Sequence, residues 1–308
     1  MLIAMCRYVR QLLVLLVLML LQIAPGSAWL SSAVAGNLLW KVAGEKGGVY
    51  LLGSIHFGKQ NMYPLDDAIN RAYQAADALV VEINILELDL VETARVMSGK
   101  GFYTDGTNLQ SHLSPATWNA LGAAAARHDL PLAFFQPQKP WLVTMTLSVL
   151  ELKRAGYDEN LGIDKHFLDL AKSRKPILEL ETFAQQIDFL NGFSPEEQEA
   201  LLRQTLLDLK QSADYFDAIV RAWQNGDDNH IDAIINKQLL QDSLSDASSK
   251  KIYRVLLTER NQAMSEKIEQ LMTDGRTYFV VVGAGHLVGE DGIVNLFTQK
   301  PGYTVEKL

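Results

Sequence analysis

The sequence predicts an α/β fold with a central, largely parallel sheet, flanking helices and a helical insertion. Residues 278–282 form an unbroken apolar, β-branched run, which is typical of a strand buried on both faces. A similar run covers residues 49–52, near the other end of the chain. Each run leads into a Gly-x-x-His unit, and these units end at His56 and His286. Because open α/β sheets bind ligands at the carboxyl ends of their strands, we expect both units to form one site.

The first 28 residues have the layout of a secretory signal peptide. Two arginines precede an apolar core at residues 12–24, and small residues follow it. This core is too short to span a membrane comfortably. We therefore expect cleavage after Ala28 or Ala35, a periplasmic or secreted protein, and no stable membrane insertion once the leader is removed. An uncleaved anchor is the alternative.

Charge and cysteine content narrow the chemistry of the exported chain. Residues 1–28 contain two arginines and no acid, so the rest has 26 Lys and Arg against 36 Asp and Glu, a formal net charge of −10. This acidic balance argues against nucleic-acid binding. The single cysteine, Cys6, precedes the apolar core. We therefore expect no disulfide after cleavage, and any metal must be bound through nitrogen and oxygen.

The chain beyond the leader predicts alternating strands and helices. Residues 38–43 and 49–52 flank a glycine-containing loop and predict a β-hairpin. A helix is expected after Pro64, followed by a buried strand over residues 78–81 that ends at Glu82. A right-handed crossover would bring Glu82 to the sheet edge that carries His56.

The remaining elements, from residue 114 to the carboxyl terminus, are predicted from shorter apolar runs and from helix-start patterns. Residues 194–272 have helical patterning almost throughout, beginning at a capping box, and predict the helical insertion. A last edge strand is expected near the carboxyl terminus. The predicted elements are helices at 114–127, 141–152 and 162–171, and strands at 132–135, 176–180 and 302–307.

Three polar side chains follow predicted strands and suggest a metal site. His56, Glu82 and His286 make a set of two imidazoles and one carboxylate, an arrangement that binds divalent metals with open coordination positions. The alternative is that each glycine only makes a turn and each histidine only caps it.

Further candidates are Asp164, Glu181 and Arg260. Asp164 lies at the start of a predicted helix, where a carboxylate is also favoured by the helix dipole alone. Glu181 follows a buried strand as Glu82 does, although an exposed loop acid is equally compatible with its position. Arg260 is explained either by a surface pair with Glu259 or by binding of a substrate carboxylate or oxyanion. The other histidines are weaker candidates, and of these only His166 stays open; they are His112, His128, His166 and His230.

These motifs resemble the TraB/GumN family, which includes the Tiki proteins and is distantly related to the erythromycin-esterase and ChaN-like groups. The resemblance covers residues 37–308. It implies a fold like that of the erythromycin-esterase and ChaN-like groups, and it implies a metal-dependent hydrolase, which in the Tiki branch is a peptidase. His56, Glu82 and His286 match the family's essential positions. The matching segments are Gly53–His56, Leu79–Glu82, Gly162–Asp164, Leu180–Thr182, Glu259–Asn261 and Val282–Gly289.

The leading hypothesis is a hydrolase of peptide or protein substrates that uses manganese, cobalt, zinc or iron. His56 and His286 would bind the metal, with Glu82 as a ligand or as the base that acts on water. One alternative is a metal-free, esterase-like hydrolase in which His56 activates water and Glu82 or Glu181 orients it. Another is a non-enzymatic protein that binds haem or a peptide.

Overall fold

A six-stranded mixed, mostly parallel sheet forms the centre of the fold, as the sequence predicts. The computed structural model describes residues 37–209, 212–240 and 246–308. The strands lie in the order β4-β3-β5-β2-β1-β6. Their bounds are β1 Leu39–Ala43, β2 Gly48–Ser54, β3 Ala78–Val81, β4 Ile177–Glu179, β5 Thr277–Gly283 and β6 Thr304–Lys307.

Strand β5 lies between β3 and β2 and runs parallel to both. Its residues Tyr278–Val282 are fully buried, as expected for an apolar run covered on both faces. Val281 pairs with Val81 of β3, and Gly283 pairs with Ser54 of β2. The three strands therefore end side by side at one edge of the sheet.

The antiparallel strands close the other side of the sheet. β1 and β2 pair as the predicted hairpin, with Trp40 opposite Leu51. β6 pairs with β1 and forms the predicted edge strand. The parallel and antiparallel parts share β2, which carries the first Gly-x-x-His unit at its end.

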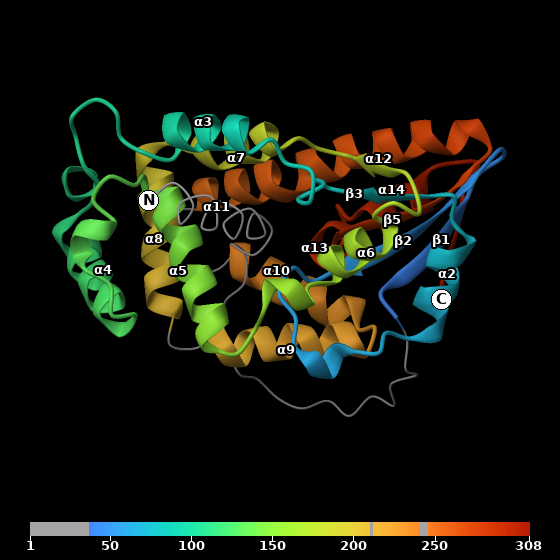
Figure 1. Ribbon diagram of the computed structural model, residues 1–308, viewed down its shortest axis with the longest axis horizontal. Coiled ribbons are helices and arrows are strands. Elements are labelled where there is room, and N and C mark those ends of the chain that lie inside the picture. Colours follow the sequence, from blue (N-terminus) through green and yellow to red (C-terminus); the bar gives the residue numbers. More distant parts are fainter. Residues whose placement is uncertain (1–36, 210–211, 241–245) are drawn as a thin grey trace.

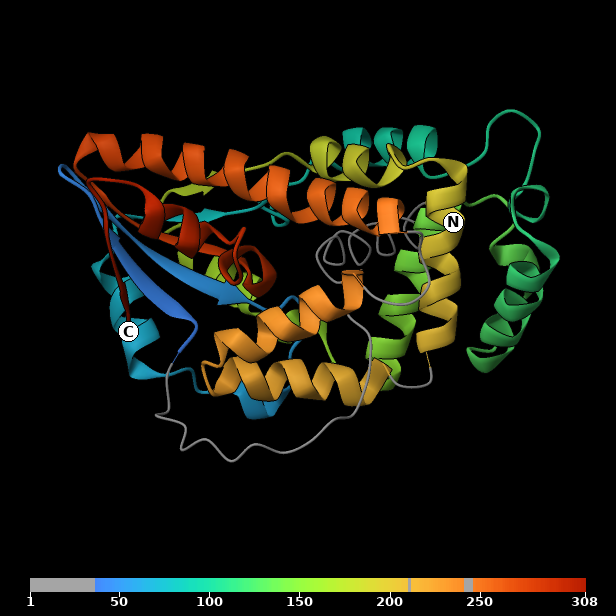
Figure 2. The ribbon, with the colours of Figure 1, turned by 180° about the vertical axis from the view of Figure 1, so that it is seen from behind.

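Helices cover both faces of the sheet and extend beyond the ends of its parallel strands (Figures 1 and 2). α2 and α6 cover one face, where Tyr73 and Phe167 pack on Phe279 of β5. α12 and α14 lie against each other on the opposite face. The bounds are α2 Asp67–Ala75, α3 Leu90–Lys100, α4 Pro115–Arg127, α5 Pro140–Arg154, α6 Ile163–Ala171, α7 Phe183–Asn191, α8 Pro195–Asp208, α9 Ser212–Gln224, α10 Asp228–Leu240, α11 Asp246–Tyr253, α12 Glu259–Leu271, α13 Ala284–Leu287 and α14 Ile293–Gln299.

A second apolar cluster lies away from the sheet, between α4, α5 and α8. Leu121, Val143 and Leu202 meet there and are fully buried. The strand predicted over 132–135 is wrong: Leu132–Phe134 forms a 3-10 helix that leads Phe135 into this cluster. A four-residue apolar run does not distinguish strand from helix, and here it packs on helices rather than on a strand.

The segment predicted as a helical insertion contains α8 to α12, between strands β4 and β5 of the sheet. Its treatment as one inserted unit of a single domain stays a prediction. Among the described residues, none of the helices combines the length and the apolar composition that a membrane span needs. The predicted signal peptide, at residues 1–28, lies outside the described residues.

Candidate active site

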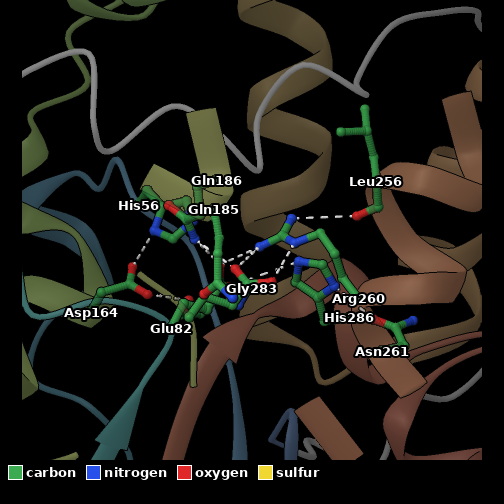
Figure 3. A network of polar contacts seen from close by, with 12 residues as sticks. His56, Glu82, Asp164, Gln185, Gln186, Leu256, Arg260, Asn261, Gly283 and His286 are labelled. Atoms are coloured by element: carbon green, nitrogen blue, oxygen red, sulfur yellow. Dashed lines mark hydrogen bonds and ion pairs between the residues drawn. The ribbon is translucent and has the colours of Figure 1, made fainter. Parts of the chain in front are cut away.

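His56, Glu82 and His286 converge at the carboxyl edge of the parallel strands, as the sequence predicts (Figure 3). His56 follows β2, Glu82 directly follows β3, and His286 lies in α13 directly after β5. The side chain of Glu82 reaches the end of the neighbouring strand β5, where the Gly283 N–H donates to Glu82 Oε1 at 2.8 Å. Parallel pairing of the three strands thus brings together residues separated by most of the chain.

His56 is held by backbone pairing with the segment that carries Asp164. Ile163 N donates to Ile55 O at 2.9 Å. A Cβ at Gly162 would lie 2.2 Å from His56 O, so this close approach requires glycine. The pairing places Asp164 Oδ2 at 2.6 Å from His56 Nδ1. The ring of His56 is therefore oriented by a carboxylate.

The contact between His56 and Asp164 changes the pKa of both groups. Burial alone would lower the pKa of His56, but the carboxylates of Asp164 and Glu82 raise it above its usual value. Burial likewise opposes ionisation of Asp164, yet His56 and the Ser54 hydroxyl lower its pKa. The Ser54 hydroxyl donates to Asp164 Oδ1 at 2.6 Å. The pair therefore favours imidazolium and carboxylate.

A buried ion cluster joins Glu82, Glu181 and Arg260. Arg260 Nη2 donates to Glu82 Oε2 at 2.8 Å and to Glu181 Oε2 at 2.7 Å, while its Nε donates to Glu181 Oε1 at 2.8 Å. All three side chains are buried. Burial raises the pKa of Glu82 above its usual value, although Arg260 and His56 oppose this shift. Glu181 is thus part of the site and not an exposed loop acid.

A π-helical segment, Arg254–Thr258, precedes Arg260 and shapes its surroundings. Within it Glu259 N donates to Arg254 O, one residue further back than in an α-helix. The Leu256 carbonyl accepts from Arg260 Nη1 at 3.3 Å. All three guanidinium nitrogens of Arg260 are therefore engaged within the protein.

Gln186 of α7 is a site residue that sequence reasoning missed. Its Nε2 donates to Glu82 Oε2 at 3.1 Å and to Glu181 Oε2 at 2.9 Å. The signal available was local: Thr182 and Gln185 form a capping box that places Gln186 in the first turn of a helix directly after Glu181. That pattern locates the turn but not the direction in which Gln186 points.

His286 is completely buried, and Asn261 determines its tautomer. Asn261 Nδ2 donates to the Asp291 carbonyl at 2.8 Å, so its Oδ1, which lies 2.6 Å from His286 Nδ1, accepts the ring proton. His286 Nε2 is then unprotonated, and it has no hydrogen-bond partner among the described residues. Burial, with the charges of Arg260 and His56, holds the pKa of His286 well below its usual value.

An unprotonated nitrogen and a carboxylate oxygen thus face each other in the interior. His286 Nε2 lies 3.9 Å from Glu82 Oε1. Two buried acceptors at this distance require a positively charged or proton-donating group between or beside them. Both histidines are anchored through Nδ1, which is how metal-binding histidines are usually held. The donor types therefore fit a divalent cation, although the described side chains contain no group of three His, Cys, Asp or Glu that could hold a metal ion.

The remaining histidines lie outside this cluster. His112 stacks on Tyr103, and His128 Nε2 lies 2.9 Å from Glu151 Oε1. His166 packs between Tyr63 and Phe167, and His230 is exposed. Within the described part of the chain, the contacts of these four rings are with residues outside the site.

Two helices of the segment 194–272 contact the histidine-bearing turns. Trp223 Nε1 in α9 donates to the Gly53 carbonyl at 2.6 Å. Ile235 of α10 packs on Gly285, where an added Cβ would lie 2.8 Å from its Cδ1. This segment thus forms a wall against both Gly-x-x-His units.

Comparison with known proteins identifies relatives over nearly the whole described chain. The sequence profile of the TraB/PrgY/gumN family matches residues 38–307. The chain is 29% identical over 245 residues to a protein of Escherichia coli named "Uncharacterized protein YbaP", covering 79% of this chain and 85% of that protein. It is 22% identical over 277 residues to an "Uncharacterized protein" of Treponema pallidum, covering 86% and 81% respectively. No solved structure matches.

Proposed function

The chain belongs to the TraB/PrgY/gumN family, and from that premise we propose that it is an exported, metal-dependent hydrolase of peptide or protein substrates. His56, Glu82 and His286 would hold the divalent metal, which is manganese, cobalt, zinc or iron. The choice of peptide substrates rests on the resemblance to the Tiki proteins.

One observation carries the metal assignment. The Nε2 atom of His286 is buried, unprotonated and without a hydrogen-bond partner among the described residues, and it lies 3.9 Å from Glu82 Oε1. A cation would satisfy both atoms, and it would also balance the excess of negative charge that Glu82 and Glu181 leave over Arg260.

The protein side chains prepare the site in distinct ways. When bound, a divalent metal would supply Lewis-acid activation of water and of the scissile carbonyl. Asp164 and Asn261 fix the rings of His56 and His286 through Nδ1. Arg260 holds Glu82 and Glu181. We assign Arg260 a positioning role rather than oxyanion binding, because all its nitrogens are already engaged.

Metal analysis of the purified exported protein tests this proposal. We expect a stoichiometric divalent metal in the wild type, its loss in His286→Ala, and its retention in the control His112→Ala. Hydrolysis of a peptide library should stop with EDTA and return when Mn²⁺ is added in excess. A wild type that neither retains nor binds a metal, under conditions where peptides are hydrolysed, would contradict the metal assignment.

The contact between His56 and Asp164 favours a second candidate, a metal-free hydrolase. In this alternative the His56 imidazole would act on water with Asp164 as its partner, and Arg260 would supply the positive charge near Glu82. Turnover that survives both EDTA and the substitution His286→Ala would favour it over the metal-dependent reaction.

Export of the protein is a separate part of the proposal. The apolar leader and the small residues that follow it support cleavage after Ala28 or Ala35. Amino-terminal sequencing of the exported fraction should therefore begin between about residues 29 and 37, as the signal-peptide layout implies. Recovery of intact Met1 in the membrane fraction would instead identify the leader as an anchor.

A further inference from the structure

Gln186 contacts both carboxylates of the site, Glu82 and Glu181. It is almost fully buried, and its Nε2 donates to Glu82 Oε2 at 3.1 Å and to Glu181 Oε2 at 2.9 Å. We propose that Gln186 is a positioning residue that holds Glu82 with Oε1 directed toward His286. Where it concerns metal binding, this inference rests on the proposed function.

The two carboxylate oxygens of Glu82 accept hydrogen bonds from different donors. Oε2 accepts from Arg260 and Gln186, which come from different helices. Oε1 accepts from Gly283 N at 2.8 Å and faces His286 Nε2. With Oε2 held by two donors, the carboxylate cannot rotate without breaking charge-assisted hydrogen bonds. Gln186 thus fixes the oxygen that is directed at the histidine.

The neutrality of Gln186 matters as much as its geometry. When both are ionised, Glu82 and Glu181 carry two negative charges, and the guanidinium of Arg260, which contacts both, balances one of them. A lysine or arginine in place of Gln186 would balance the second. An amide instead bridges both carboxylates and leaves the cluster with a net negative charge. Such a cluster can still attract a cation at Oε1.

Gln186→Met tests this inference, because methionine keeps the length of the side chain and removes both donated hydrogen bonds. The matched control is Gln198→Met. Gln198 of α8 is also a buried glutamine, but its Nε2 donates at 2.9 Å to the carbonyl of Phe193, just before that helix and away from the carboxylates. Unfolding midpoints of both variants identify any general loss of stability, and Gln186→Asn serves as the variant that keeps an amide if methionine prevents folding.

The first measurement is the ¹⁵N spectrum of the imidazole rings in the metal-free exported protein, with His286 assigned from His286→Ala. We expect the Nε2 resonance of His286 to shift in Gln186→Met, and in Gln186→Asn if that variant is needed. It should keep its wild-type position in Gln198→Met. An unchanged His286 resonance in a folded Gln186 variant would overturn the inference, whatever the protein's activity.

The second measurement is the affinity for Mn²⁺ alone. We expect Gln186→Met to weaken Mn²⁺ binding by about 10- to 100-fold, the usual effect of losing a group that orients a metal ligand. Gln198→Met should bind Mn²⁺ as the wild type does. Equal affinity in Gln186→Met and the wild type would overturn the positioning role. A wild type that binds no Mn²⁺, combined with the shifted His286 resonance, would refute the metal proposal and support the role of Gln186.

Discussion

Arg260 Nη2 donates to Glu82 Oε2 at 2.8 Å in the interior of the protein. Glu82 is therefore not surrounded by imidazoles alone, because a guanidinium from α12, the helix before β5, supplies a positive charge beside it. Because Glu181 shares the same guanidinium, the cluster still carries an excess of negative charge. That excess and the unpartnered Nε2 of His286 among the described residues are the two features that favour a metal.

The ion cluster predicts a large effect of removing its cation. Arg260→Met would leave Glu82 and Glu181 buried without their partner, and we expect the free energy of unfolding to fall by about 3–5 kcal/mol. Urea denaturation measures this change. The control Arg276→Met removes an exposed pair with Asp274, which solvent screens, and should change stability far less than Arg260→Met does.

Equal losses in the two arginine variants would contradict the structural role of the cluster. If Arg260→Met does not fold, Arg260→Lys can replace it, because lysine keeps a charge but not the bidentate geometry. Its loss of stability should be greater than that of Arg276→Met and smaller than that of Arg260→Met. The double variant Arg260→Met, Glu181→Gln should recover part of the loss, since it removes one of the two uncompensated charges.

Asp208 predicts a pH dependence of stability that is independent of the site. Burial raises its pKa to about 6 from a usual value of 3.8, although Gln204 donates to it. The folded state therefore binds a proton more tightly than the unfolded state. The free energy of unfolding should accordingly fall as pH rises from about 4 through 6, by at most about 3 kcal/mol.

The variant Asp208→Asn isolates this effect because all other titrating groups contribute equally to the pH dependence of stability in both proteins. Denaturation of both proteins should show similar stability near pH 4, with the variant more stable by pH 7. A difference that does not change with pH would indicate that Asp208 titrates as it does in the unfolded chain.

The parts of the fold that the sequence predicted correctly are those with strong local signals. The apolar runs that became β2, β3 and β5 are buried on both faces, so each is recognisable by itself. The position of β5 between β2 and β3 depends on pairing over most of the chain, and no local pattern encodes it. The run at 132–135 was wrongly predicted because its partners are helices.

The candidate site likewise has one part that local sequence signals predict and another part that depends on tertiary packing. His56, Glu82 and His286 were predicted from their places after strands, and the structure brings them to one edge. Gln186 was missed because the side of a helix that faces the site depends on tertiary packing. The π-helical turn before Arg260 was also missed, since nothing in residues 254–258 departs from ordinary helical composition. Sequence thus located the strand ends, whereas the structure supplied what surrounds them.

The contact between Trp223 and Gly53 predicts that the helical wall contributes to the position of His56. Trp223→Phe keeps an aromatic ring but removes the N–H that donates to the Gly53 carbonyl at 2.6 Å. The buried carbonyl then loses this donor, and we expect the free energy of unfolding to fall by about 1–3 kcal/mol. The His56 ring resonances should shift as well, because Gly53 begins the turn that carries this histidine.

A matched control separates this local effect from the loss of a buried indole. Trp141→Phe removes an N–H that donates to the Lys100 carbonyl at 3.3 Å, far along the chain from His56. It should lower stability while leaving the His56 resonances in place. If Trp223→Phe also leaves them in place, α9 acts only as a packing element. If they shift, the wall formed by α9 holds the first histidine through the backbone of β2, as Asp164 holds it through the imidazole.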